Sequence, residues 1–446
     1  MRVAVLGYGR QGQSAAEYWY NLEPKNTITI CDANADLKVP ARFEKQLGKN
    51  YLKNLDGFDI IVRGPSVHPA NIAKANTAEI LQKVTTTSNE FIRICPTKNI
   101  IGVTGTKGKG TTSTLIAKIL EADGKTVHLG GNIGIDPLLL LKENIKPDDW
   151  VVLELANFQL IDLKVSPHIA VCLMTVPEHL DWHSNLDEYY RAKTNLFANQ
   201  TKKDIAIYNE NYESSKYIAS FSKGHKIGFD VPQLGTHTKM QNASYVSNGN
   251  IYHKSNLICS INDVSLFGRH NLENICAAIS AIWGIVENKN MIKKVICEPL
   301  NLQHRLELVA TINNVRYYND SLSTTPETTI AAIKSFTEPK ILILGGSSKG
   351  IDLEPITKAC IKNNVRYCVL IGQTADQLSK YFIMHGLNNF SIVNTNMKDV
   401  VACARKHSQK GDVVLLSPGC ASFGLFKDYE DRANQFKNAV YNMAKD

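Results

Sequence analysis

Short runs of β-branched and other apolar residues alternate with helix-like patterns along the whole chain of 446 residues. Several of these runs lead directly into Gly, Ser or Asn before a helical pattern begins. Strands that are apolar throughout are typical of parallel sheets, which helical crossovers cover on both faces. The pattern therefore predicts an α/β protein built on mainly parallel sheets. The clearest runs are Val3–Leu6, Thr27–Cys31, Ile60–Val62, Ile100–Val103, Trp150–Leu153, Ala170–Met174, Ile205–Tyr208, Lys340–Leu344, Cys368–Ile371 and Val413–Leu416.

The length suggests about three domains, at roughly 150 residues each. A new strand–loop–helix unit begins after Cys95–Lys98, and a helical region over residues 272–286 gives way to a strand at Val315–Tyr318. We therefore expect domains at residues 1–96, 97–298 and 299–446. The turn-rich segment 223–265 predicts a small antiparallel insertion in the central domain.

Composition and charge exclude several classes of protein. Lys plus Arg is 50 and Asp plus Glu is 42, and these basic residues are scattered rather than clustered, which disfavours nucleic-acid binding and fits small anionic substrates better. The longest apolar stretches are too short to span a bilayer, and residues 1–10 lack the features of a signal peptide. The ten cysteines form no C-x-x-C pair, as in a protein with reduced thiols. We expect a cytoplasmic protein with no membrane insertion and no nucleic-acid partner.

The first glycine-rich loop, Gly7–Gly12, follows an apolar run and opens a helical pattern. Free N–H groups at a helix start favour a diphosphate, which Gly9, Arg10 and Gln11 would contact. Asp32 ends the next strand, about where a dinucleotide fold places its ribose carboxylate. The loop alone leaves three alternatives open: NAD or FAD, another nucleotide such as a UDP-sugar, or a tight turn without a ligand.

The second glycine-rich loop is the stronger signal. The backbone N–H groups of such a loop form an anion nest, and Lys109 can reach the β- and γ-phosphates of ATP. Two positions depart from the common phosphate-binding loop, because Val103 stands at its first glycine and Gly110 follows the lysine. A magnesium-binding hydroxyl must then come from Thr111 or Thr112. A Gly/Lys turn formed by chance is the alternative. The loop residues are Gly105, Thr106, Lys107, Gly108, Lys109, Gly110, Thr111 and Thr112.

This loop resembles that of the Mur ligases and the folylpolyglutamate synthases, which are ATP-dependent enzymes that form amide bonds. Further motifs cover essentially the whole chain in the order of the family, and they indicate the branch of the Mur ligases that adds glutamate. They are Glu154–Leu160, Pro177–His183, Arg191–Lys193, Gly268–Asn274, Gln303–Arg305, Asn319–Ser321, Leu416–Phe423 and Phe426–Tyr429.

The resemblance implies a Rossmann-like N-terminal domain for UDP-N-acetylmuramic acid, a central P-loop-type ATPase domain and a Rossmann-like C-terminal domain for glutamate. It implies that ATP phosphorylates the alanine carboxylate of UDP-N-acetylmuramoyl-L-alanine and that glutamate, in the first place D-glutamate, attacks the acyl phosphate. The chain would be a monomeric enzyme of peptidoglycan precursor synthesis. The alternatives are ligation of L-glutamate or another acidic amino acid, an NAD-dependent oxidoreductase that uses the first loop, and a non-catalytic UDP-sugar-binding module.

The resemblance also implies the roles of single residues. Two Mg²⁺ ions would be held by Thr111, Glu154, His179 and Lys193, the last as a carbamate formed with CO₂. The sequence pattern alone makes Lys193 a surface residue of a helix over 186–197, and for Asn271 it offers N-capping of a helix as the alternative to a contact with ATP. It leaves open whether Asp181 and His183 support the metal site or cap a turn. The other implied contacts are Asn271, His304, Arg305 and Asp320 with ATP, Asn132 with phosphate or the muramoyl group, and Lys349, Ser422, Phe423 and Tyr429 with glutamate.

Three positions depart from the family pattern. Leu322 stands where a lysine is frequent, which removes a cation from the expected glutamate site. Arg63–Val67 replaces the usual Ser-Pro-Gly, and Ala156–Asn157 replaces the usual Ser-Ser. The first two changes weaken the assignments for glutamate and for the UDP-sugar, whereas the third leaves Glu154 intact.

Overall fold

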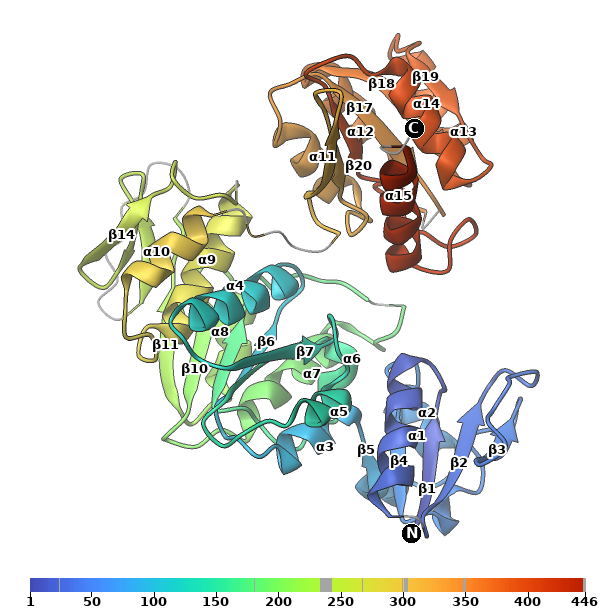
Figure 1. The fold of residues 1–446 in the computed structure, drawn as a ribbon. Coiled ribbons are helices and arrows are strands. Elements are labelled where there is room, and N and C mark those ends of the chain that lie inside the picture. The colour runs from blue at the N-terminus through green and yellow to red at the C-terminus, as the bar shows by residue number, and fades with distance from the viewer. Residues whose placement is uncertain are drawn as a thin grey trace. The chain divides into compact units, whose positions relative to one another are not determined.

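The computed structural model describes residues 1–443 apart from 24, 180, 233–242, 267, 299, 301–303, 348 and 349. The chain divides into two compact units, Met1–Leu300 and Asn301–Asp446. Figure 1 shows three mainly parallel sheets with helices packed on them, two in the first unit and one in the second. The predicted α/β class is confirmed, and the apolar runs named above lie in strands, except that β9 (Ile169–Cys172) ends before the last two residues of the run Ala170–Met174.

The N-terminal sheet is parallel throughout and has the order β3-β2-β1-β4-β5. Residues of β1 are buried alternately in two cores, one that contains Val3 and Val5 and one that contains Ala4 and Leu6. Burial on both faces explains why this strand is apolar at consecutive positions. The elements are β1 (Arg2–Leu6), α1 (Arg10–Leu22), β2 (Thr27–Asp32), β3 (Glu44–Leu47), η1 (Leu55–Gly57), β4 (Ile60–Arg63), α2 (Pro69–Ala75), η2 (Ala78–Lys83), β5 (Val84–Thr85) and α3 (Thr87–Ile94).

The central sheet is also parallel, in the order β11-β10-β9-β6-β8-β7. The carboxyl ends of β9, β6 and β8 are therefore neighbours, and ligands of open parallel sheets bind at that edge. The elements are β6 (Ile100–Thr104), α4 (Lys109–Ala122), β7 (Val127–Gly131), α5 (Pro137–Leu140), η3 (Leu141–Glu143), β8 (Trp150–Glu154), α6 (Asn157–Leu160), β9 (Ile169–Cys172), α7 (Leu186–Ala198), β10 (Ile205–Asn209), α8 (Glu213–Ser220), β11 (His225–Phe229), α9 (Arg269–Ile282) and α10 (Asn290–Cys297).

The predicted antiparallel insertion is smaller than expected. Strands β12 (Ser244–Ser247), β13 (Asn250–His253) and β14 (Asn256–Ser260) form an antiparallel sheet of three strands, which confirms the prediction for these residues. The prediction was wrong for β11, which pairs in parallel with β10 and extends the central sheet instead.

Several polar contacts attach the N-terminal sheet to the central one, and two carboxylates take part in them. Arg63, at the end of β4, donates from Nε to Oδ2 of Asp162 at 2.9 Å and from Nη2 to Oδ1 at 2.6 Å. Asp136 accepts hydrogen bonds from Ser14 Oγ at 2.6 Å and from Thr87 Oγ1 at 3.0 Å. The arginine in the departure from Ser-Pro-Gly thus connects two parts of the chain.

The C-terminal unit holds a sheet in the order β15-β16-β20-β17-β18-β19, parallel except for its first pair. Separate cores cover its two faces. The elements are β15 (Glu307–Ile312), β16 (Val315–Asn319), α11 (Pro326–Lys334), β17 (Lys340–Gly345), α12 (Glu354–Lys362), β18 (Val365–Ile371), α13 (Ala375–Met384), β19 (Phe390–Ile392), α14 (Met397–His407), β20 (Val413–Leu416) and α15 (Tyr429–Met443). Across the described parts of both units, no helix combines the length and apolar character needed to cross a membrane.

Candidate active site

The second glycine-rich loop connects β6 to α4 at the carboxyl edge of the central sheet. The helix begins at Lys109, inside the segment that the sequence assigns to the loop. Gly108 has a φ of +87°, and a methyl group there would lie 2.1 Å from Oδ1 of Asn274, so both the backbone and the neighbour require glycine. The amide groups at the start of α4 form a site suited to phosphate.

Two lysine side chains converge on this loop. Lys109 donates from Nζ to the carbonyl oxygens of Gly105 at 3.0 Å and Thr106 at 3.1 Å. Lys193 donates from Nζ to the same Gly105 oxygen at 3.3 Å. Two amine groups therefore lie together where the γ-phosphate of a bound nucleotide would lie.

The surface position expected for Lys193 from the sequence pattern is wrong. Its side chain is fully buried on α7, with Nζ 4.8 Å from the centre of the Tyr189 ring. The Tyr189 hydroxyl lies 2.8 Å from Thr106 Oγ1, so it ties this helix to the phosphate loop. Burial, and then repulsion by Lys109, lowers the pKa of the Lys193 amine to about 7. A substantial fraction of this amine is neutral at physiological pH.

Glu154 ends β8 beside the loop and is largely buried. Its Oε1 accepts a hydrogen bond from Asn132 Nδ2 at 2.9 Å, while a methyl group at position 110 would come within 3.0 Å of its Oε2. Gly110, a departure from the common loop, therefore leaves space between the helix start and the carboxylate. A carboxylate oxygen beside a phosphate site fits the preference of Mg²⁺ for hard oxygen ligands.

Asparagines at the start of α9 reach the same loop. Thr112 Oγ1 donates to Asn274 Oδ1 at 3.3 Å, and Asn274 Nδ2 donates to Asn271 Oδ1 at 3.2 Å. The helix starts at Arg269 after Gly268, without a side-chain cap, so the interpretation of Asn271 as an N-cap is wrong. Thr112 is directed to Asn274, and the choice of Thr111 as the magnesium ligand stays a prediction.

His179 lies in a tight turn with a φ of +58°. Its carbonyl oxygen accepts hydrogen bonds from the backbone of Trp182 and His183, and its ring lies 4.8 Å from that of Phe158. Burial, opposed by Glu178 and assisted by Lys109, lowers the pKa of His179. The imidazole is thus neutral near pH 7 and carries the lone pair that a metal ligand needs.

Lys107 pairs with a neighbour of His179, since its Nζ lies 2.6 Å from Glu178 Oε1. Burial acts to raise the pKa of Glu178, but the hydrogen bond and the attraction of Lys107 outweigh it and leave the pKa lowered. Lys107 is therefore held by a carboxylate, whereas Lys109 is directed back at the loop.

His183 is buried in a cluster with His68 and Glu188, which explains the departure at Asn157. Asn157 Nδ2 lies 2.6 Å from His183 Nε2, while His183 Nδ1 and His68 Nε2 each lie 3.4 Å from Glu188 Oε2. The Ala70 N–H donates to His68 Nδ1 at 3.1 Å, which places the proton of the neutral ring on Nε2. His68 Nε2 and His183 Nδ1 are buried and make no hydrogen bond within the described residues, so these two nitrogens and Glu188 form a compact polar cluster.

The first glycine-rich loop has the form of an anion site. Gly9 precedes α1 as an N-cap without a side-chain bond, and Arg10 begins the helix. A methyl group at Gly12 would lie 1.9 Å from the Gly7 carbonyl oxygen, so the strand and helix approach as closely as a dinucleotide fold requires. Asp32 accepts the Tyr8 N–H at 2.8 Å, which holds the carboxylate at the loop.

Three predicted ATP contacts belong to the C-terminal unit. His304 has a φ of +63°, and its Nδ1 lies 3.1 Å from Asn319 Nδ2. Asp320 is buried and accepts a hydrogen bond from Ser417 Oγ at 2.7 Å. Burial raises the pKa of Asp320 to about 6, against the attraction of Arg305. Asp320 lies in the interior of this unit, where it organises the end of β16.

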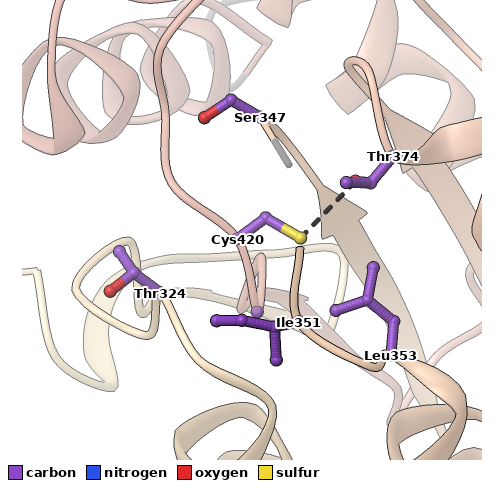
Figure 2. A pocket seen from close by; sticks show the side chains of 7 residues that line it. Thr324, Ser347, Ile351, Leu353, Thr374 and Cys420 are labelled. Carbon is purple, nitrogen blue, oxygen red and sulfur yellow. Dashed lines mark hydrogen bonds between the residues drawn. The ribbon is translucent and has the colours of Figure 1, made fainter. Parts of the chain in front are cut away.

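A small pocket opens at the carboxyl end of β17 in the same unit, where Cys420 Sγ lies 3.4 Å from Thr374 Oγ1 (Figure 2). Of the predicted glutamate contacts, Ser422 is buried two residues beyond Cys420, Phe423 is 64% exposed and Tyr429 begins α15. Lys349 lies outside the described residues. The pocket is lined by Thr324, Ser347, Ile351, Leu353, Thr374, Gly419 and Cys420.

Sequence reasoning missed several aromatic residues near the phosphate loop. Tyr190, Tyr212 and Tyr217 line a cleft of about 550 Å³ beside the phosphate loop. The cleft adjoins the loop because Val176, another lining residue, donates its N–H to Thr106 Oγ1 at 3.0 Å. Tyr190 lies on α7, whereas Tyr212 caps and Tyr217 belongs to α8, so no single local pattern brings the three together.

A phosphate loop, a buried carboxylate and two converging lysines on a parallel sheet define an α/β nucleotide-binding protein of the P-loop type. Family models for the Mur ligase middle domain and for the Mur ligase glutamate ligase domain match residues 103–282 and 304–420. A UDP-N-acetylmuramoylalanine–D-glutamate ligase from Clostridium tetani is 36% identical over 99% of this chain and 97% of its own. Its counterpart from Clostridium kluyveri is 37% identical over the same shares.

The fold agrees with these matches. The structure of a UDP-N-acetylmuramate–alanine ligase, MurC, from Thermotoga maritima superposes with a TM-score of 0.63 at 16% identity, over 99% of this chain and 100% of the other. The chain belongs to the Mur ligase family, which confirms the resemblance found in its motifs.

Proposed function

We propose that this chain is the ligase that adds D-glutamate to UDP-N-acetylmuramoyl-L-alanine in peptidoglycan precursor synthesis, using ATP. The observation that carries the proposal is the convergence of Lys109 and Lys193 on one carbonyl oxygen beside Glu154. It occurs in a chain whose relatives, matched over nearly their whole length, bear the name of that ligase.

The chemistry explains why Lys109 and free amide groups lie at this position. A carboxylate oxygen of the alanine must attack the γ-phosphorus of ATP, so two anions have to meet, and ADP leaves as the acyl phosphate forms. Lys109 and the amide groups at the start of α4 lower the cost of that encounter. The neutral amine of glutamate then attacks the acyl carbon, phosphate departs, and the nitrogen loses a proton to give the amide.

The residues around the loop also fit magnesium. Glu154 and Thr111 would hold one ion, and His179 with a carbamoylated Lys193 a second, because these groups offer hard oxygens and a neutral imidazole. Bound magnesium would neutralise charge on the phosphates. Carbamoylation joins the neutral Lys193 amine to CO₂ with release of a proton, and the pKa of about 7 supports it.

The UDP-sugar and glutamate would bind at other loops of the chain. The start of α1, with Gly9, Arg10 and Gln11, would bind the diphosphate of the UDP-sugar. The pocket beside Thr324, together with Ser422, would bind glutamate, and the other predicted contacts keep the roles given by the motifs. We further propose that the enzyme acts in the cytoplasm as a monomer.

The test is phosphate release from ATP with UDP-N-acetylmuramoyl-L-alanine and, in separate reactions, D-glutamate, L-glutamate, D-aspartate or no amino acid. We expect release with D-glutamate and its loss in Lys109→Met, while Lys202→Met, which changes an exposed lysine, keeps the wild-type rate. Release that is independent of the amino acid would contradict the proposal, and release with L-glutamate alone would reassign the substrate.

A further inference from the structure

Arg432 is a fully buried arginine on the first turn of α15 that none of the motifs pointed to. Its guanidinium donates from Nε to Ser321 Oγ at 2.9 Å, from Nη2 to the Ser321 carbonyl oxygen at 2.8 Å and from Nη1 to the Cys420 carbonyl oxygen at 3.2 Å. All three acceptors are neutral. The arginine thus joins two segments that are about 100 residues apart in the chain.

The charge of this arginine has no carboxylate beside it. Within the described part of the chain, no acidic oxygen lies within ion-pair distance of the Arg432 guanidinium, although Asp320 attracts it from farther away. Burial lowers the pKa of Arg432 to about 10, so the side chain remains charged at neutral pH. A buried cation without a counter-charge is costly, and an anionic ligand would offset that cost.

The two segments that Arg432 joins contribute to the lining of the pocket in Figure 2. Thr324, three residues after Ser321, lines it from one segment, and Gly419 and Cys420 line it from the other. Gly419 N–H donates to the Ser323 carbonyl oxygen at 2.8 Å, so the two segments are direct neighbours. The fully buried Lys340 makes a useful contrast, because its Nζ donates to the carbonyl oxygens of Phe336 and Glu338, outside this pocket.

We infer that Arg432 is the positioning residue of the glutamate site. It holds the two segments that carry Thr324 and Cys420, and it supplies the buried positive charge that favours a dicarboxylic acid. The inference rests on the proposed function, because it assumes that this pocket receives glutamate. It also accounts for the departure at Leu322, where the family often carries a lysine. A cation behind the pocket wall takes over part of the attraction that the missing side chain would have provided.

The test compares full-length wild type with Arg432→Met, Arg432→Lys and the control Arg405→Met, which changes an exposed arginine on α14. We expect Arg432→Met to raise the KM for D-glutamate about tenfold or more, with the KM values for ATP and the UDP-sugar within about twofold of wild type. Its preference for glutamate over glutamine, as the ratio of kcat/KM values, should fall by a similar factor. Arg432→Lys keeps the charge and should keep most of that ratio.

Each outcome has a separate meaning. Wild type without glutamate-dependent phosphate release would refute the proposed function itself. An active wild type combined with an unchanged KM and ratio in Arg432→Met would overturn the inference alone. Equal losses for glutamate and glutamine would show a merely structural role. If Arg432→Met does not fold, Arg432→Lys decides, because loss of the ratio with the charge retained would also overturn the inference.

Discussion

Replacing Asp162 by alanine should weaken the attachment of the N-terminal sheet to the central sheet. Arg63, its partner, is fully buried, and the two side chains share two hydrogen bonds of 2.9 and 2.6 Å. The alanine variant leaves the guanidinium with carbonyl acceptors only, those of Gly64, Val67 and Phe158. An uncompensated buried charge is the physical cost of this change.

The magnitude follows from the burial of the pair. Breaking a buried ion pair by removing one partner costs about 3–5 kcal/mol. The Asp162 side chain is 18% exposed, so water reaches the pair from one side and the lower end of that range, about 3 kcal/mol, applies. For a unit of this size the loss corresponds to a fall in Tm of about 6 °C.

Thermal and urea unfolding, followed by circular dichroism, measure this loss. The matched control is Asp187→Ala, which breaks the Arg191–Asp187 pair on the surface, with exposed fractions of 69% and 63%. That pair should contribute less than about 1 kcal/mol. Equal shifts for Asp162→Ala and Asp187→Ala would refute the argument that burial gives the Arg63 pair its strength.

Three further predictions concern protonation and space. Because the pKa of Lys193 is lowered to about 7, the neutral fraction of its amine rises from about a tenth at pH 6 to about nine-tenths at pH 8, and carbamate detected by ¹³C NMR with bicarbonate should rise with it; a signal independent of pH would contradict this. Burial raises the pKa of Asp320 to about 6, so its stabilising contribution is complete below the unfolded value and lost as pH rises through 6, and Asp320→Asn should flatten urea stability across this window; an unchanged slope would count against it. Gly110→Ala places a methyl group 3.0 Å from Glu154 Oε2 and should raise the Mg²⁺ concentration for half-maximal activity severalfold, whereas Gly284→Ala, in open space, should match wild type.

The strands that the sequence predicts are those buried on both faces. β1 and β17 are apolar at consecutive positions because helices cover both sides of their sheets. β3, with the sequence EKQL, is an exposed or half-exposed edge strand, so it carries no apolar run and was not predicted. The glycine-rich loops were predicted because their pattern is local: the residues that form such a loop are neighbours in sequence.

The candidate site was predictable only where its residues belong to such local motifs. Residue patterns alone placed Lys193 at the surface, since a lysine on a helix is usually solvated, and only the family resemblance gave it a role. The partners of Arg63 and Arg432 are 99 and 111 residues away in the sequence. No periodicity encodes contacts of that kind, because tertiary packing creates them.

These buried cations differ in what offsets their charge, and that difference separates structural from functional positions. Arg63 meets a carboxylate from its own chain, so its charge is balanced before any ligand arrives. Lys193 reduces its charge through a depressed pKa, which leaves an amine able to react with CO₂. Arg432 has only neutral acceptors and keeps its charge, in the wall of a pocket assigned to a dianionic amino acid. A cation that the protein leaves unbalanced beside a pocket stabilises the fold less than a balanced one would, and an anionic substrate that binds there gains the attraction that no carboxylate of the chain has taken.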